Sequence, residues 1–230
     1  MNLCVIPARG GSKRIPRKNI REFCGKPMLA WSIEAAKASG CFDHIIVSTD
    51  DDEIAEIARG WGADVPFMRP AHLSDDYVGT TEVIAHAIDW MDRHLVTATL
   101  TCCIYATAPF VTPDDIRQGL EVLQSSGAQY AFSVTSYPFP IQRAIRITSN
   151  RRVEMFYPEH FNSRSQDLEE GFHDAGQFYW GRAKAWLQGK LLFSPESVPV
   201  ILPRHRVQDI DTLEDWTRAE WLFKAMQQTI

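Results

Sequence analysis

Six cationic side chains gather near the N-terminus, in a stretch that also contains the adjacent glycines Gly10 and Gly11. No acidic residue interrupts these cations before Glu22. Glycine lets backbone N–H groups approach anionic oxygens, while lysine and arginine side chains supply countercharge. This composition favours a loop that binds phosphate groups. The six cations are Arg9, Lys13, Arg14, Arg17, Lys18 and Arg21.

The stretch matches neither of the two commonest phosphate motifs, the Walker A loop and the dinucleotide fingerprint G-x-G-x-x-G. A solvated basic loop is the alternative interpretation of such a charge cluster. Its position favours binding, because the apolar run at residues 3–6 is typical of a buried first strand. In an open α/β sheet, ligands bind at the carboxyl ends of the strands.

A second pattern that could carry chemistry lies near the C-terminus, where Asp209 and Asp211 alternate. In an extended segment both carboxylates point to one face, and such a pair can hold Mg²⁺ together with substrate phosphates. The alternative is that the two acids only stabilise the start of the helix that follows. The pattern alone supports both interpretations equally.

Longer stretches decide between them. Residues 7–19 read P-A-R-G-G-S-K-R-I-P-R-K-N and residues 207–212 read V-Q-D-I-D-T. Both resemble signatures of the CMP-sugar synthetases, the cytidylyltransferases for sialic-acid-like nonulosonic acids. Tyr105 stands where the sialic acid enzymes carry glutamine. Similarity to the pseudaminic acid branch of that family covers nearly the whole chain and is clearest at residues 103–110, 162–168 and 173–179.

The resemblance implies a transfer of CMP from CTP to pseudaminic acid, with release of pyrophosphate, for glycan or flagellin glycosylation. The cofactor would be Mg²⁺ on Asp209 and Asp211. The catalytic residues would be Lys18, Arg9 and Asp211. The nucleotide would be bound by Ala8, Arg9, Gly10, Ser12, Lys13, Lys18, Asn19, Arg69 and Thr80. The sugar would be bound by Tyr105, Arg164, Gln166, Asp174, Gln177 and Tyr179.

Arginine can donate two parallel hydrogen bonds to a carboxylate, and Arg164 is the candidate for binding the carboxylate of the sugar. Pseudaminic acid carries a methyl group where sialic acid has a hydroxylated end, so an apolar wall is expected around Tyr105, Phe178, Tyr179 and Phe193. Two alternatives stay open. One is a CMP synthetase for N-acetylneuraminate or legionaminate, and the other is a glycosyltransferase that uses the D-x-D with a nucleotide-sugar donor.

The elements that must position these residues alternate along the chain. Strands are predicted at residues 3–6, 44–49, 65–67, 100–106 and 128–135, and helices at 27–39, 53–61, 82–94 and 113–126. This order is typical of an α/β fold with a mainly parallel, doubly wound, Rossmann-like sheet in a single domain, residues 1–230. The acids at residues 50–53 fit a helix start better than a metal site.

The alternation stops at Ser136. Residues 137–175 are predicted to leave the sheet as an insertion, with a hairpin formed by residues 144–147 and 153–156. Its apolar residues would need a partner, which favours a homodimer in which this segment serves dimerisation and sugar binding. Strands then follow at residues 177–180 and 198–202, and Thr212 with Asp215 marks the start of a last helix.

Composition narrows the class of protein. The chain has 230 residues, is 45% hydrophobic and carries a net charge of −5, which suits a small anionic ligand and argues against nucleic-acid binding. Neither a membrane-spanning run nor a signal peptide is recognised. The five cysteines form neither a disulfide pattern nor a zinc pattern, and a cytoplasmic enzyme is expected.

Overall fold

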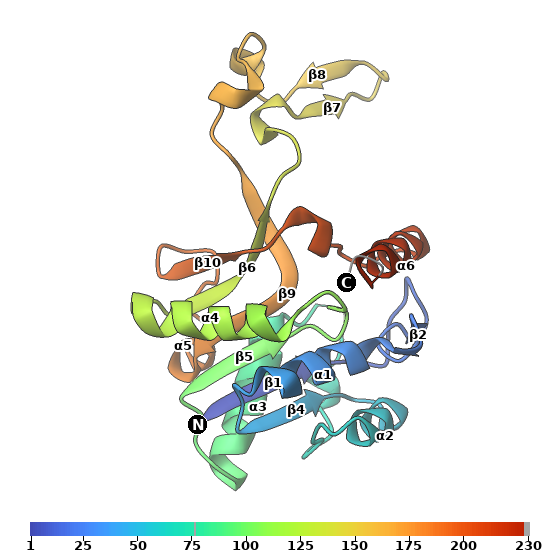
Figure 1. The fold of residues 1–230 in the computed structure, drawn as a ribbon, viewed down its shortest axis with the longest axis vertical. Coiled ribbons are helices and arrows are strands. Elements are labelled where there is room, and N and C mark those ends of the chain that lie inside the picture. Colours follow the sequence, from blue (N-terminus) through green and yellow to red (C-terminus); the bar gives the residue numbers. More distant parts are fainter. Residues whose placement is uncertain (76, 228–230) are drawn as a thin grey trace.

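The computed structural model of the chain describes residues 1–75 and 77–227 and is organised around one sheet (Figure 1). Its six strands are β1 (Asn2–Pro7), β4 (His44–Ser48), β5 (Leu100–Ile104), β6 (Tyr130–Ser136), β9 (Phe172–Arg182) and β10 (Ser197–Ile201). Their order is β10-β6-β9-β5-β1-β4. Only β9 runs antiparallel to its neighbours among these strands, so the predicted mainly parallel sheet is confirmed.

Helices cover both faces of this sheet, as expected for a doubly wound fold. They are α1 (Met28–Ser39), α2 (Asp52–Gly60), α3 (Thr80–His94), α4 (Pro113–Ser126), α5 (Ala183–Leu187) and α6 (Leu213–Gln227). One core cluster joins the sheet to α1, α2 and α4, and a second joins it to α3 and α5. The last helix packs through Trp216, Ala219 and Phe223 on a third cluster that includes Ile15 and Phe23.

Successive side chains of the central strands pack on opposite faces of the sheet. Cys4 and Cys102 lie in the cluster under α1 and α4, whereas Leu3 and Cys103 lie in the cluster under α3. Successive side chains of a strand point to opposite faces, so a run that is apolar throughout serves both cores. The adjacent cysteines Cys102 and Cys103 are therefore both buried, on opposite faces of the sheet.

Outside the insertion, the main differences from the sequence-based prediction lie at residues 65–67, 22–27 and 183–187. Residues 65–67 form no strand, and only isolated bridges at Asp64 and Met68 pair with the β4 region. Pro66 lacks the N–H that a ladder needs. Two elements were not predicted: the two-stranded ribbon of β2 (Glu22–Phe23) with β3 (Lys26–Pro27), and the short helix α5. Each is too short to produce a periodic pattern.

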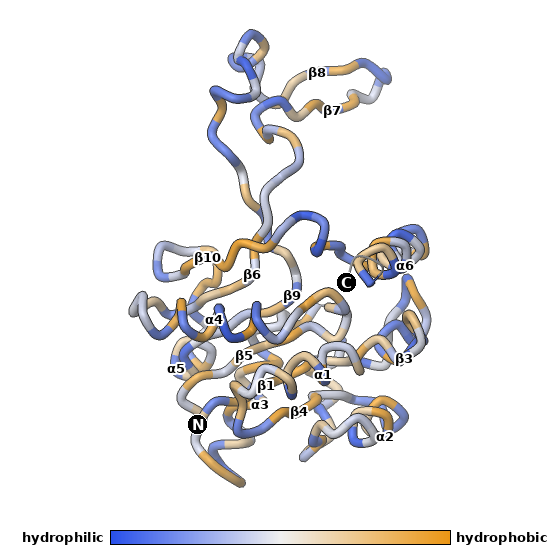
Figure 2. Tube along the Cα trace, in the orientation of Figure 1, coloured by the Kyte–Doolittle hydropathy of each residue, from blue (hydrophilic) through white to orange (hydrophobic). Residues whose placement is uncertain are grey.

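The segment after β6 rises out of the sheet and returns as β9 (Figures 1 and 2). It contains the hairpin of β7 (Ile145–Ile147) and β8 (Val153–Met155), as predicted, and the short helical turns η2 (Ile141–Arg143), η3 (Pro158–His160) and η4 (Ser165–Asp167). Its C-terminal end differs from the prediction, because Phe172, His173 and Asp174 already pair with β6. The segment that leaves the sheet therefore comprises residues 137–171, and we call it the projecting lobe.

Candidate active site

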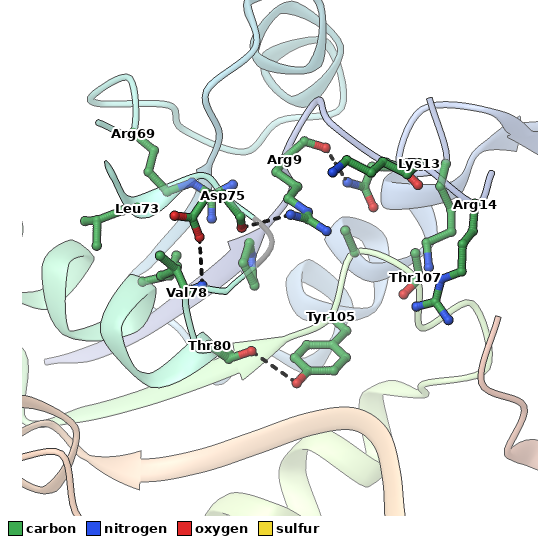
Figure 3. A pocket seen from close by; sticks show the side chains of 16 residues that line it. Arg9, Lys13, Arg14, Arg69, Leu73, Asp75, Val78, Thr80, Tyr105 and Thr107 are labelled. Atoms are coloured by element: carbon green, nitrogen blue, oxygen red, sulfur yellow. Dashed lines mark hydrogen bonds between the residues drawn. The ribbon is translucent and has the colours of Figure 1, made fainter. Parts of the chain in front are cut away.

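The cationic stretch follows β1 and lines a cavity of about 540 Å³ at the carboxyl ends of β1 and β5 (Figure 3). We call this the first cavity. Seven residues predicted to bind a nucleotide line it, and so do Arg14 and Tyr105. The seven are Arg9, Ser12, Lys13, Lys18, Asn19, Arg69 and Thr80. Positive charge is thus concentrated at the edge of the sheet where the fold places ligands.

Hydrogen bonds within the loop and to the start of α2 hold the loop in shape. Asn19 is buried and donates through Nδ2 to the Arg9 carbonyl oxygen at 2.9 Å. Arg17 adopts a positive φ of 56° and donates to both carboxylate oxygens of Asp51, at 2.5 and 2.9 Å. Asp51 also accepts from the Ile54 N–H at 3.0 Å and caps α2. The expected helix-start role of these acids is confirmed.

The two remaining residues predicted for the nucleotide, Ala8 and Gly10, do not line the first cavity. Ala8 is fully buried, and its N–H donates to the Ser48 carbonyl oxygen. The Gly10 N–H donates to Asp50 Oδ1 at 2.9 Å, and a Cβ on Gly10 would lie 2.6 Å from Asp51 Oδ2. Glycine at this position lets the loop approach the start of α2 closely.

Arg69 forms a buried cationic wall of the first cavity. Its side chain is 4% exposed and lies 3.8 Å from Asp50. Burial lowers the pKa of the guanidinium from its ordinary value. Within the described part of the chain, its Nε and Nη2 have no hydrogen-bond partner. Buried donors without a partner are costly, so these groups are suited to an acceptor brought by a ligand.

A second cavity of about 560 Å³ shares Tyr105 with the first. Its polar lining comes from β6, β9, α6 and the segment between β10 and α6. The residues are Thr135, Ser136, His173, Asp174, Tyr179, Arg204, Gln208, Asp209 and Arg218. Since Tyr105 lines both cavities, ligands bound in the two cavities would meet beside this side chain.

Hydroxyl groups connect the two cavities. The Tyr105 hydroxyl lies 3.2 Å from Thr80 Oγ1 (Figure 3). The Tyr105 ring centroid lies 5.1 Å from that of Tyr179. Tyr179 donates its hydroxyl to Asp174 Oδ2 at 2.7 Å. Burial is the main cause that raises the pKa of both tyrosines above the ordinary value. Both phenols therefore stay protonated near neutral pH and can donate hydrogen bonds.

The D-x-D segment lies between the cavities. Lys18 Nζ donates to the Ile210 carbonyl oxygen at 2.6 Å and lies 3.5 Å from Asp211 Oδ1. Asp211 also pairs with Arg14 at 2.8 Å, while Asp209 lines the second cavity. Burial, followed by the charge of Asp211, raises the pKa of Asp209. The structure thus brings together Lys18 and the two carboxylates from opposite ends of the chain.

The sequence profile of a family described as "Cytidylyltransferase" matches residues 3–161. A protein of Campylobacter jejuni serotype O:2 named "Pseudaminic acid cytidylyltransferase" is 46% identical over 228 residues, which cover 99% of this chain and 98% of that one. The chain belongs to the cytidylyltransferase family.

More distant relatives of this cytidylyltransferase include the "CMP-N,N'-diacetyllegionaminic acid synthase" of Legionella pneumophila, which is 33% identical over 99% of this chain and 98% of that one. A solved CMP:2-keto-3-deoxy-manno-octonic acid synthetase, complexed with CTP, shares the fold. It has a TM-score of 0.70 at 17% identity and covers 100% of this chain and 99% of that one.

Some residues predicted for the sugar lie outside both cavities of the cytidylyltransferase. Arg164 is 71% exposed in the projecting lobe, where it donates to both oxygens of Asp167 at 2.6 and 3.0 Å. Gln166 lies beside it in η4 and is also exposed. Gln177 is buried and donates through Nε2 to the Arg206 carbonyl oxygen at 2.5 Å. Tyr105, Asp174 and Tyr179 do line the second cavity.

Two aromatic residues expected near the sugar are elsewhere. Phe178 is fully buried in the cluster under α1 and α4, because it neighbours Tyr179 in β9 and must point to the opposite face. Phe193 is exposed and packs on Phe132, with ring centroids 5.5 Å apart. Among the predicted aromatic residues, therefore, only Tyr105 and Tyr179 line the second cavity.

Sequence reasoning missed several cavity residues. Arg14 belongs to the cationic stretch and could have been selected with it. Arg204 and Arg218 line the second cavity from η5 (Arg204–Arg206) and from α6. Arg204 and Arg218 are distant from each other and from the insertion in the sequence, so no local pattern identifies them as cavity residues. They come together because the chain after β10 and helix α6 return to the edge of the sheet.

Proposed function

We propose that this cytidylyltransferase couples CTP to pseudaminic acid and yields CMP-pseudaminic acid and pyrophosphate. One observation carries the proposal: a cationic cavity and a second, mixed polar cavity share Tyr105, with Lys18 and the D-x-D at their junction. The two relatives at 46% identity, both pseudaminic acid cytidylyltransferases of Campylobacter jejuni, indicate the sugar and the nucleotide.

The nucleotide would occupy the first cavity. Arg9, Ser12, Lys13 and Lys18 would bind the triphosphate, since they lie on the loop after β1 and supply donors and charge. Asn19, Arg69 and Thr80 would bind the ribose and the base. Arg69 suits this role because its buried donors need an acceptor.

Magnesium fits the junction through the chemistry of the available donors. Asp209 and Asp211 offer hard oxygen ligands, and a cation would offset the burial and the charge of Asp211 that together raise the pKa of Asp209. When bound, Mg²⁺ would neutralise phosphate charge and lower the pKa of the attacking hydroxyl group. Binding would compete with the present contacts of Asp211 to Arg14 and Lys18.

The sugar would lie in the second cavity with its anomeric hydroxyl toward Lys18 and Asp209. This oxygen forms a bond to the α-phosphorus, and the bond from that phosphorus to the bridging oxygen of pyrophosphate breaks. Such a reaction depends on positioning and charge stabilisation. Arg204 and Arg218 give the cavity cations for the sugar carboxylate, and Tyr105, Asp174 and Tyr179 give it hydrogen-bonding groups.

We also propose a homodimer formed through the projecting lobe. Phe139, Ile147, Val153 and Phe161 are large apolar residues of the lobe that this chain leaves exposed. Exposed apolar surface of this kind marks an interface. Arg164 and Gln166 would then reach the sugar cavity of the neighbouring subunit. A reducing cytoplasm is the proposed compartment, because all five cysteines are free.

Pyrophosphate release from CTP tests the function. We expect release only when a nonulosonic acid is added, and at least about tenfold higher kcat/KM with pseudaminate than with N-acetylneuraminate, because a sialic acid hydroxyl left unpaired against the apolar ring face of Tyr105 costs about 1–3 kcal/mol. Legionaminate provides a third comparison. Equal or better use of N-acetylneuraminate would reject the sugar assignment, and the absence of release with all three acids would reject the function.

A further inference from the structure

An ion pair connects Arg206, which precedes the D-x-D segment, to Asp115 in the first turn of α4. Arg206 donates through Nη1 to Asp115 Oδ2 at 2.6 Å and through Nη2 to Oδ1 at 2.9 Å. The side chains are 17% and 6% exposed, respectively. Neither residue lines the described cavities. Arginine and carboxylate in this two-point geometry fix both distance and orientation.

Asp115 is itself held by the first turn of α4. Its Oδ2 accepts from the Thr112 N–H at 3.0 Å and from Thr112 Oγ1 at 2.7 Å, and its own N–H donates back to Thr112 Oγ1 at 3.2 Å. This reciprocal arrangement is a capping box. The acceptor for Arg206 therefore belongs to a helix that packs on the sheet, and it cannot follow a movement of the D-x-D segment.

The backbone of Arg206 is bound as well. Gln177 donates through Nε2 to the Arg206 carbonyl oxygen at 2.5 Å, and the Gln177 carbonyl oxygen accepts from the Tyr105 N–H at 2.9 Å. Four residues after this anchor, at Ile210, the segment contacts Lys18. The chain from 206 to 210 is thus held at both ends, by the sheet and α4 on one side and by Lys18 on the other.

We propose that Arg206 and Asp115 are positioning residues for the transfer reaction. Their ion pair sets where residues 207–211 lie, so that Asp209 faces the second cavity while Ile210 and Asp211 face Lys18. This inference rests on the proposed function. The inference extends that function by assigning a mechanistic role to two largely buried side chains that line neither cavity.

Three variants separate positioning from stability. Arg206→Met removes the guanidinium and leaves the Asp115 carboxylate buried without its partner. Arg206→Lys keeps the charge but loses the two-point geometry. The double variant Arg206→Met/Asp115→Asn removes the unpaired charge and keeps a side-chain oxygen for the cap. Arg93→Met is the matched control, because it breaks an exposed ion pair with Asp89 on α3.

We expect Arg206→Met to lower both the melting temperature and kcat. The double variant should recover melting temperature because no buried charge is left unpaired. Its kcat should stay about 10- to 100-fold below wild type, the usual effect of losing a group that orients a ligand. The KM for CTP should change by less than about twofold, because the first cavity keeps its own residues. Arg206→Lys should fall between, and Arg93→Met should match wild type.

Hydrogen exchange supplies a readout that does not depend on turnover. In the folded double variant, amides of residues 207–212 should exchange at least about tenfold faster than in wild type, while those of α4 and β9 keep their protection. Recovery of both melting temperature and kcat in the double variant would overturn the inference, and so would a loss of kcat with unchanged exchange. Wild-type protein that releases no pyrophosphate would reject the proposed function, whereas the exchange result would still test the anchor.

Discussion

Lys18 belongs to the first cavity and also contacts the D-x-D segment. In the proposed reaction, its charge would lie beside the transferred phosphate, on which negative charge develops. We predict that Lys18→Ala lowers kcat by roughly 10²–10³-fold, the usual loss when one preorganised charge stabiliser is removed. Pyrophosphate release at saturating CTP measures the effect. Lys184→Ala, at an exposed position on α5, is the control, and unchanged turnover in Lys18→Ala would contradict this role.

Tyr179 gives a pH prediction. Burial raises its pKa in the folded protein, whereas an unfolded tyrosine ionises near its ordinary pKa of about 10. Above that pH the unfolded chain binds fewer protons than the folded one, so the free energy of unfolding falls as pH rises. Tyr179→Phe should reduce this alkaline loss.

Urea unfolding at mildly and strongly alkaline pH measures the effect. Tyr77→Phe is the control, because Tyr77 is 95% exposed. Equal alkaline losses in Tyr179→Phe and wild type would show that Tyr179 does not carry the effect.

At the scale of elements, α4 approaches β9 through Gly119. A Cβ at this position would lie 2.7 Å from Phe178 Cε2 and 2.7 Å from Trp180 Cδ1. We predict that Gly119→Ala destabilises the fold by about 1–3 kcal/mol, because overpacking outweighs the gain of about 1 kcal/mol in helix propensity. Chemical denaturation measures this difference.

Gly60→Ala is the matched helical control, because a Cβ there meets nothing within 4 Å. It should be neutral or slightly stabilising. If Gly119→Ala were as stable as Gly60→Ala, the close approach of α4 to β9 would not limit the side chain at this position.

At the scale of the whole molecule, the apolar lobe predicts self-association. Ile147→Asp should shift the protein from dimer to monomer, because a carboxylate cannot be buried in the apolar interface without a large cost. Light scattering coupled to size exclusion measures the mass. Leu191→Asp is the control, since Leu191 is 76% exposed outside the lobe. A wild-type protein that is monomeric at all working concentrations would contradict the dimer.

A mixing experiment tests whether Arg164 acts across that dimer. Chains that carry Asp211→Ala and chains that carry Arg164→Ala should each be weakly active alone. If Arg164 serves the neighbouring subunit, a mixed dimer contains one complete site, and exchange of subunits should restore about a quarter of wild-type activity. No gain on mixing would assign Arg164 to its own chain or to no site.

The sequence by itself determined the alternation of strands and helices and the mainly parallel sheet. It also determined the cationic stretch after the first strand and the D-x-D before the last helix. These features depend on local periodicity and on neighbouring residues such as Arg9 to Lys18, so they can be recognised without knowing what packs on them. The D-x-D also gained its interpretation from the sequence, through the resemblance of residues 207–212 to a family signature.

Only the tertiary structure decided which side chains share a cavity. Phe178 and Tyr179 are adjacent, but the pleat of β9 sends one into the core and the other to the second cavity. Gln177 and Arg206 lie far apart in sequence and meet because β9 runs beside the segment after β10. Arg164 looked like a cavity residue, yet the lobe carries it away from the sheet edge. Long-range pairing decides these placements, and it leaves no local signal in the sequence.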